Sequence, residues 1–600
     1  MGGPNNIDNF FNSFQRAAGF HDITPVRRGS ISTNEPDDPA QHDTRRRPQR
    51  PPLQSILTQQ MLGAEPQSSE TIRPVQDQTE PEEATETTNL LNPPSGYVPS
   101  SYRPRLASDI ISQHGEYGMS YGSISSRISR TARKRATILI NEQIEASRRA
   151  RDMPEEYKDD LLERPVEVEE LPDGEVIERI IGESTVPMTI FNSTNVLIGV
   201  GILALPLAIR YSGWVIGLSF LTIAAVMTAY TAMILSKCLD TNVASTTYGD
   251  IAFVAFGQVG RSFVEVLFIL ELVAANTALI ILFADSMYFL VPSVQILYWK
   301  FIIALGLIPL NFVSFKALSV TSVLGIVCVG GLIVSVLVNG LIKPHSPGSL
   351  REVATTYAFP ENWKTIPLSF GLIMAPWGGH SIFPAIYKDM RHPRKYGRAV
   401  RSTYIFTYGL DLTMAVLGYL MFGEQVRDEI TANILNSNSY PHIIRLLMVV
   451  LIAIIPVTKI PLSNRPIMDT VNKKFMIDLR QMDARARIYS ERALSHRLGR
   501  GSTAVLVNIL ELAVAIGLPS FDAIMGIMGS ALCFTICATL PLLFYVKIFW
   551  GGGAIKFPEK ALCFVLITAC IILSVVGTGF SVLPKEKLGI KSCDGRILCY

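Results

Sequence analysis

Ser184 to Arg210, STVPMTIFNSTNVLIGVGILALPLAIR, is the stretch that decides the fold. It is long enough to cross a bilayer, because roughly 20 apolar residues rising about 1.5 Å each span the hydrocarbon. It also carries asparagines, glycines and a proline, which a lipid-facing anchor does not need. A membrane helix opens only where protein or a water-filled cavity satisfies the freed backbone groups, which otherwise cost several kcal/mol. The stretch therefore predicts a transmembrane helix that opens between Asn195 and Pro206.

The glycines of this stretch have two interpretations. Gly199 and Gly201 remove side chains, so that a small ligand can touch the backbone. Asn192, Asn195 and Gly199 also fall on one face of a helix, which gathers polarity and space on one side. Small residues equally let membrane helices pack closely together, and this segment alone leaves both interpretations open.

A second interrupted span strengthens the first interpretation. Ser369 to Pro384 contains Pro376-Trp377-Gly378-Gly379-His380 in the middle of an apolar run. Five helices separate the start of one broken span from the start of the other. Interrupted helices at corresponding positions of two halves point to a transporter with a binding site near the middle of the membrane.

Apolar segments predict an all-α polytopic membrane protein with about eleven transmembrane helices. The predicted transporter domain covers 184–583, between a tail over 1–183 and a short C-terminal segment over 584–600. The predicted spans are 188–209, 214–236, 262–284, 299–315, 317–342, 366–386, 402–422, 440–458, 502–518, 520–546 and 560–583.

Composition agrees with a membrane protein, because 48% of the residues are hydrophobic and 18% are charged. The net charge of +3 is too small to imply a nucleic-acid partner. Six cysteines lie in or beside apolar segments and are expected to be buried thiols. Cys593 and Cys599 follow the last span and can pair only in an oxidising compartment.

The tail from residue 1 to 183 is rich in Pro, Ser, Gln, Arg and Glu, and we expect it to be largely disordered. Two stretches within it have helical potential, Ala136 to Arg149 and Glu175 to Gly182. The first lies on an anionic membrane surface or, as we prefer, is a solvated charged segment.

A short motif in the tail has a possible sorting role. Glu86-Thr-Thr-Asn-Leu90-Leu91 resembles the acidic dileucine signal that adaptor complexes read on cytosolic tails bound for endosomal, lysosomal or vacuolar membranes.

Lys and Arg in short loops are retained on the cytosolic side of a membrane. The loops 387–401 and 459–500 are rich in both, whereas the loop 423–439 has Arg427 against three acidic residues. We therefore expect a cytosolic tail, and an odd number of crossings then places the C-terminus on the luminal side.

An amino acid would suit a site between two opened helices. Amide N–H groups at half-helix N-termini would bind its carboxylate, and freed backbone carbonyls would bind its ammonium. Asn195 and Ser193 could add side-chain hydrogen bonds, and Trp377 could close one side of the pocket. His380 is a donor, a proton carrier or a side chain that only satisfies opened backbone.

Ionisable residues inside membrane spans are costly and are functional candidates by default. Glu271 is central in the third predicted span, Asp411 in the seventh and Glu511 in the ninth. Glu271 and Asp411 are the candidates for proton coupling, Glu271 being the stronger. For Asp411 and Glu511 we prefer a role in helix packing through a hydrogen bond.

Several motifs resemble the amino acid/auxin permease family. They are the first span from Ser184 to Pro206, Tyr211-Ser-Gly-Trp214, Leu239-Asp-Thr241, Trp377-Gly-Gly-His380 with Phe383-Pro384, Asp389-Met-Arg-His-Pro393 and Asp428-Glu-Ile-Thr431. The last three, beginning at Trp377, Asp389 and Asp428, narrow the resemblance to the fungal vacuolar amino acid transporters related to vesicular GABA carriers. The likeness runs from about Thr185 to Phe580.

The resemblance implies a five-plus-five inverted repeat of LeuT-like type, and a vacuolar membrane location. It also implies proton-driven antiport of neutral amino acids from the cytosol into the vacuole, with no cofactor besides the proton gradient. The family's binding positions carry over to Asn195, Gly199 and Gly201 and to Trp377, Gly378, Gly379 and His380. Related sodium-coupled members place a hydroxyl near Thr458, but the adjacent Lys459 disfavours sodium here.

Alternatives remain open at this point. The chain could export amino acids from the vacuole, act as a plasma-membrane permease, or bind amino acids as a receptor without transporting them. We do not expect an enzyme, because no metal-ligand cluster, nucleophile motif or phosphate loop stands out in the sequence.

Overall fold

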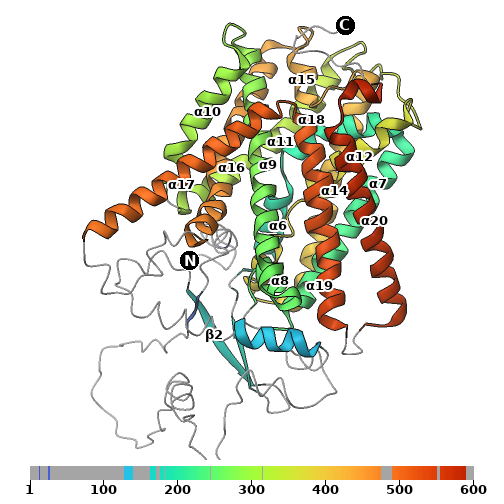
Figure 1. The fold of residues 1–600 in the computed structure, drawn as a ribbon. Helices are drawn as coiled ribbons and strands as arrows, with labels where there is room; N and C mark the ends of the chain where they lie inside the picture. The colour runs from blue at the N-terminus through green and yellow to red at the C-terminus, as the bar shows by residue number, and fades with distance from the viewer. Residues whose placement is uncertain are drawn as a thin grey trace, which may run out of the picture. The chain divides into compact units, whose positions relative to one another are not determined.

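A bundle of helices makes up most of the structure (Figure 1). The computed structural model describes Ser13 and residues 24–26, 128–139, 163–170, 176–180, 182, 184–242, 245–313, 315–474, 490–550 and 555–589.

The bundle begins with a helix that is interrupted after three turns and ends with a long helix followed by one short turn. Its helices are α6 (Val186–Leu197), η2 (Val200–Ala204), α7 (Leu205–Leu239), α8 (Tyr248–Phe256), α9 (Gln258–Leu290), α10 (Ile296–Leu310), α11 (Phe315–Ile342), η3 (Trp363–Thr365), α12 (Ile366–Met374), η4 (Ala375–Trp377), α13 (Phe383–Lys388), η5 (Pro393–Lys395), α14 (Tyr396–Phe422), η6 (Gly423–Gln425), α15 (Ile430–Leu435), α16 (His442–Lys474), α17 (Ser490–Gly517), α18 (Phe521–Ile527), η8 (Met528–Thr539), α19 (Leu540–Phe549), α20 (Phe557–Val582) and η9 (Lys585–Leu588).

Each predicted span falls on helix in the structure, which confirms a helical membrane protein. Among the described residues, seven helical stretches are long and apolar enough to cross a membrane. The predicted spans that are not among these seven fall on two shorter apolar helices, Ile296–Leu310 and Gly501–Gly517, or on the interrupted helices. The number of crossings and the inverted repeat stay predictions.

A glycine separates the first span from the second. Gly213 lies within α7 and has φ of 71°, which L side chains rarely adopt. A Cβ atom there would lie 2.7 Å from the backbone of Phe359. The amides of Trp214 and Val215 donate to the carbonyls of Tyr357 and Ala358. The chain therefore turns here because only glycine fits between these two backbones.

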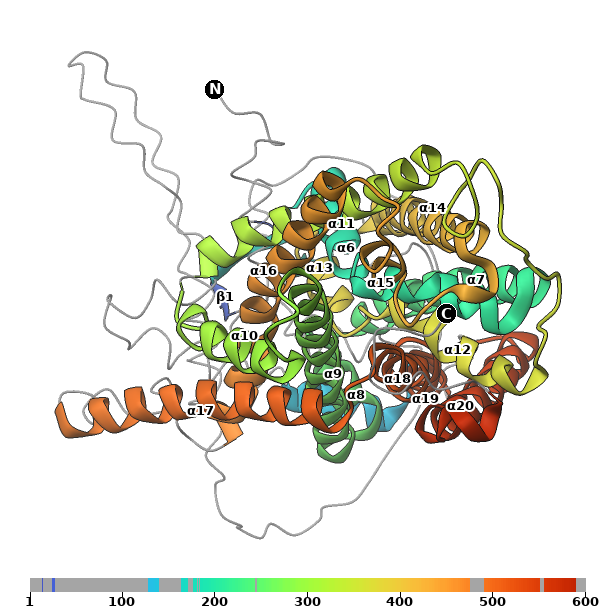
Figure 2. The same cartoon turned by 90° about the horizontal axis from the view of Figure 1, so that it is seen from above.

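The helix α9 packs against many other helices of the bundle. It packs against α8, α10, α16, α17 and η8, and Figure 2 shows it beside α10. On the other side of the bundle, α7 packs between α12 and α14. The interrupted segments η2 and η4 contact each other.

A helix over residues 130–139 belongs to the predicted tail and packs against the end of the bundle near α8. The amide of Ser129 donates to the carbonyl of Ile548 at 2.9 Å, and the Arg135 guanidinium donates to the carbonyl of Ala255 at 2.6 Å. Its buried face is Ala132, Ala136 and Leu139. Two alanines on one face let the helix lie close against the protein, so residues 136–139 are not a fully solvated segment. The rest of the predicted stretch, up to Arg149, lies outside the described residues, and its place at a membrane surface stays a prediction.

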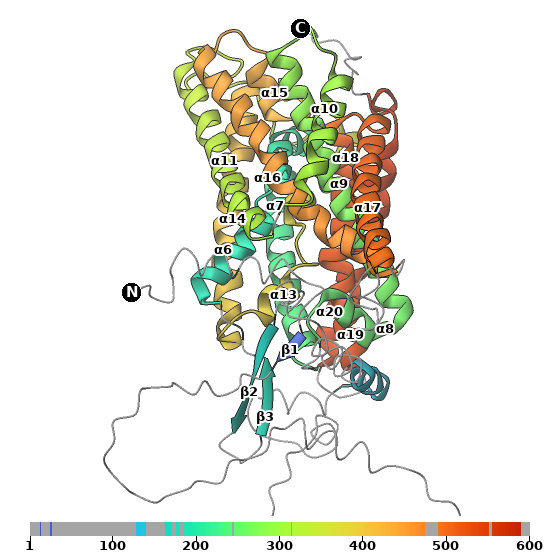
Figure 3. The same cartoon turned by 90° about the vertical axis from the view of Figure 1, so that its left-hand side faces the viewer.

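The expectation of helix from Glu175 to Gly182 is wrong. Val176–Ile180 forms strand β3, which pairs antiparallel with β2 (Glu163–Glu170), and β2 pairs in parallel with β1 (Thr24–Val26). Val166 to Glu169 of β2 alternates apolar with charged residues, which is a strand period, and Pro-Asp-Gly between β2 and β3 is a turn signal. Figure 3 shows these strands at the same end of the molecule as α8.

Other predictions for the termini fall outside the described residues. These are Glu86, Leu90 and Leu91, the pairing of Cys593 with Cys599, and the disorder of the remaining tail. The six cysteines expected to be buried thiols are buried and free.

Candidate functional site

The first predicted break is confirmed. The helix α6 ends at Leu197, and Ile198 has φ of −74° and ψ of 96°. Gly199 follows with φ of −121° and ψ of −174°, and η2 begins at Val200. Two successive extended residues leave backbone groups without their usual helical partners.

The second predicted break is also confirmed. The helix α12 ends at Met374, and the short 3₁₀ turn η4 follows it. Gly378 is extended, with φ of −63° and ψ of 127°, and helix resumes only at Phe383. This span is therefore open over Gly378 to Ile382.

The two breaks lie against each other. A Cβ atom on Gly201 would lie 3.1 Å from the backbone nitrogen of Pro376, so the two backbones approach closely there. Where α6 begins and α13 ends, next to the N-terminal tail, the Ser184 amide donates to the Asp389 carbonyl at 2.8 Å. The Arg391 amide returns a bond of 2.8 Å to the Ser184 carbonyl. The half-helices α6 and α13 are thus joined by backbone hydrogen bonds.

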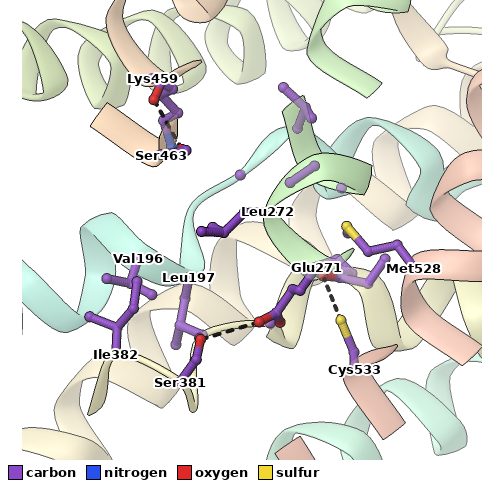
Figure 4. A pocket seen from close by; sticks show the side chains of 18 of the residues that line it. Val196, Leu197, Glu271, Leu272, Ser381, Ile382, Lys459, Ser463, Met528 and Cys533 are labelled. Carbon is purple, nitrogen blue, oxygen red and sulfur yellow. Dashed lines mark hydrogen bonds between the residues drawn. The ribbon is translucent and has the colours of Figure 1, made fainter. Parts of the chain in front are cut away.

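A cavity of about 210 Å³ lies beside these breaks. Its walls come from both opened spans and from α9, α16 and the α18–η8 helix (Figure 4). The residues that the opened spans contribute to it include Asn192, Asn195, Gly199, Gly201, Gly378 and Gly379. Asn192, Asn195 and Gly199, which the sequence predicts to share one helix face, therefore all border this cavity, although Gly199 lies beyond the end of α6.

Two of the predicted binding residues lie behind the cavity wall. Trp377 is fully buried, and its ring stacks on Tyr404 with centroids 5.4 Å apart and planes 5° apart. The Nε2 atom of His380 lies 3.0 Å from the hydroxyl of Thr231 and 3.0 Å from the carbonyl of Thr228. Neither side chain lines the cavity, so direct binding by Trp377 and His380 stays a prediction.

The candidates for proton coupling separate in the structure. Glu271 lines the cavity, whereas Asp411 is buried in α14 and is not part of the lining. Glu511 accepts a hydrogen bond of 2.8 Å from the amide of Asn276, which agrees with the preferred packing role.

Lys459 is a cavity residue that the sequence assigned to a loop. The prediction that a loop begins there is wrong, because α16 continues through Pro461 and Pro466 to Lys474. The ammonium of Lys459 donates a hydrogen bond to the carbonyl of Ile198, at the first break. The signal available in the sequence was an apolar run that resumes after a single lysine.

The chain is similar to known proteins across most of the bundle. Residues 182–583 match the family described as "Transmembrane amino acid transporter protein". Amino acid transporter AVT1C of Arabidopsis thaliana is 31% identical over 68% of this chain and 71% of its own length. The vesicular inhibitory amino acid transporter of Xenopus tropicalis is 27% identical over 60% of this chain and 70% of its own length. A solved Na⁺-coupled sialic acid symporter has a TM-score of 0.42 and 12% identity, over 66% of this chain and 88% of that one.

Proposed function

This chain belongs to the transmembrane amino acid transporter family, and we propose that it exchanges protons for neutral amino acids across the vacuolar membrane, moving the amino acids from the cytosol into the vacuole. The observation that carries the proposal is the cavity between two opened spans. Glycines at 199, 378 and 379 bring bare backbone to its surface. Opened backbone offers both amide donors and carbonyl acceptors, which a zwitterion needs.

The size and lining of the cavity support a small neutral substrate. About 210 Å³ is less than the roughly 300–1,000 Å³ typical of sites for drug-sized ligands. Phe268, Leu272 and Met528 contribute apolar wall, which suits an uncharged side chain. The similarity to amino acid transporter AVT1C and to the vesicular inhibitory amino acid transporter supports an amino acid substrate, and the second of these names supports an organelle membrane.

Lys459 supports coupling to protons rather than sodium. Its ammonium bonds the Ile198 carbonyl, one of the oxygens that an opened helix could offer to a metal ion. The hydroxyl of Thr458 instead donates to the Ile455 carbonyl of its own helix at 2.9 Å. A fixed cation at this position repels a second one. Within the cavity, Glu271 is our candidate for the proton site, with Asp411 as the second candidate outside it.

We predict that exchanging Na⁺ for choline leaves uptake by the wild-type protein unchanged. Lys459→Met should lower uptake at least about tenfold, because a hydrogen bond from a charged group contributes about 1.5–3 kcal/mol and its loss leaves a carbonyl without a partner. Uptake into reconstituted vesicles measures both. Stimulation of the wild type by Na⁺ would contradict the proposed coupling.

The function itself is tested by uptake into vesicles that carry the purified protein. With an acidic interior, labelled neutral amino acids should accumulate, and dissipating the pH difference should stop the accumulation. Failure of uptake at every imposed pH difference would favour a receptor. Accumulation only when the pH difference is reversed would favour export from the vacuole.

Location is tested through the tail. Changing Leu90 and Leu91 to Ala should move the protein from the vacuolar membrane to the cell surface, because an adaptor complex would no longer bind the signal. Fluorescence microscopy of the tagged protein reports the shift. A wild-type protein found at the cell surface would favour a plasma-membrane permease.

A further inference from the structure

One carboxyl oxygen in the cavity wall has no partner. Glu271 is 7% exposed, and its Oε2 atom accepts a hydrogen bond of 3.2 Å from the Ser381 hydroxyl (Figure 4). Its Oε1 atom is buried and has no hydrogen-bond partner among the residues that the structure describes. A buried carboxylate oxygen without a hydrogen bond costs free energy, so we expect a proton or a bound donor group at this oxygen.

The second break keeps this oxygen open to the cavity. A Cβ atom on Gly378 would lie 3.2 Å from Oε1 and 3.2 Å from the Cys533 thiol. Because residue 378 is glycine, the carboxyl group lies directly beside extended backbone, with no side chain between them. A ligand held by the opened backbone is therefore within reach of Glu271.

Two chemical groups fit this oxygen, and they exclude each other. A proton neutralises the carboxyl group and turns the oxygen into a donor. An ammonium has three donors and no acceptor, so it binds most strongly to the ionised carboxylate, which only accepts. A protonated carboxyl group has no charge to pair with the ammonium, so it binds the ammonium far less strongly than a carboxylate does.

We propose that the ammonium of the substrate and a proton compete for the Oε1 atom of Glu271. The proposal rests on the proposed function. It adds that the ammonium is the part of the substrate that Glu271 recognises, and that competition at this oxygen couples the proton to the amino acid. On the neutral side of the membrane, the carboxyl group loses its proton to water, and the carboxylate that results accepts a hydrogen bond from the ammonium. On the acidic side, a proton from water binds Oε1, and the ammonium leaves with its substrate. One proton returns for each amino acid carried.

Several other titratable groups lie near Glu271, and some of them are bonded to partners of their own. Lys459 and Cys533 are the other ionisable side chains among the residues described as lining the cavity, and Lys459 is bonded to the Ile198 carbonyl. The Tyr248 hydroxyl donates to the carbonyl of Ile536 at 2.6 Å. Further titratable groups near Glu271, or buried on the described helices packed against α9, include Cys537, His380, Lys300, Glu511, Asp250 and Asp522. Asp250 is paired with Arg261, and Asp522 with Lys585.

The test counts protons released on binding. Calorimetric titration of the purified full-length protein with L-alanine, in two buffers of different ionisation enthalpy and from pH 5 to pH 8, gives this number directly. We expect release to approach one proton per L-alanine at the acidic end. Affinity should fall about tenfold per pH unit there, because the bound state holds one proton fewer. L-Lactate, which has a hydroxyl in place of the ammonium, should release none.

Variants assign the proton to a residue. Glu271→Gln should bind L-alanine weakly and without proton release, whereas Glu265→Gln, on the same helix but outside the cavity lining, should keep the release. Release that survives in Glu271→Gln, or L-alanine binding without release in the wild type, would overturn the competition and leave the proposed transport standing. If glycine, L-alanine and L-leucine all fail to bind, the proposed function falls as well. Should Glu271→Gln not fold, Glu271→Asp shortens the side chain but keeps the carboxyl group, so it should weaken L-alanine binding and keep the release. Unchanged affinity in Glu271→Asp would overturn the assignment to Glu271.

Discussion

Gly199→Val should abolish amino acid uptake while the protein stays folded. Residue 199 is extended, with φ of −121° and ψ of −174°, a conformation that β-branched residues adopt readily. A Cβ atom there would meet only the Gly201 nitrogen, at 4.0 Å, so the new side chain projects into the cavity. It would take the place of the substrate, and a conflict of about 3 kcal/mol weakens binding roughly hundredfold.

Uptake into vesicles and the melting temperature of the purified variant measure the two halves of this prediction. Gly306→Val is the matched control, because a Cβ atom at Gly306 in α10 has nothing within 4 Å, and it should transport normally. Normal uptake by Gly199→Val would remove this cavity from the substrate path. A lowered melting temperature would instead show that residue 199 serves packing.

Gly529→Val should prevent the bundle from folding. A Cβ atom on Gly529 in η8 would lie 1.8 Å from the carbonyl oxygen of Gly371 and 2.9 Å from the nitrogen of Ala375. These are backbone atoms of α12 and η4, which cannot move aside as a flexible side chain can. Overpacking a core costs about 1–3 kcal/mol even where side chains adjust, and backbone conflict costs more. Against a total stability of about 5–15 kcal/mol, such a loss leaves little folded protein.

Size-exclusion chromatography of the detergent extract measures this effect. The monodisperse peak of the wild type should be lost for Gly529→Val and kept for Gly579→Val, since a Cβ atom at Gly579 in α20 has nothing within 4 Å. A normal peak and melting temperature for Gly529→Val would mean that α12 and η8 do not pack through these glycines. The contrast with Gly199→Val separates a glycine that leaves room for a ligand from one that leaves room for a neighbouring helix.

Local features of the chain explain the predictions that succeeded. Apolar runs predicted the helices because hydrocarbon forces backbone groups to pair within each segment. Gly199 and Gly378 marked the breaks because the residues that open a helix act within a few positions of themselves. The tail was harder, since Val176 to Ile180 is too short to show a clear period and becomes a strand only by pairing with Glu163–Glu170.

By itself, the sequence determined a membrane-spanning helical protein with two opened spans, because hydrophobicity and glycine or proline act locally along the chain. The tertiary structure decided which side chains face the cavity. It placed Glu271 and Lys459 in the wall and Trp377 against Tyr404 behind it. That assignment depends on how each helix is rotated about its axis, and the rotation is set by helices distant in sequence, such as α9 packing against α16.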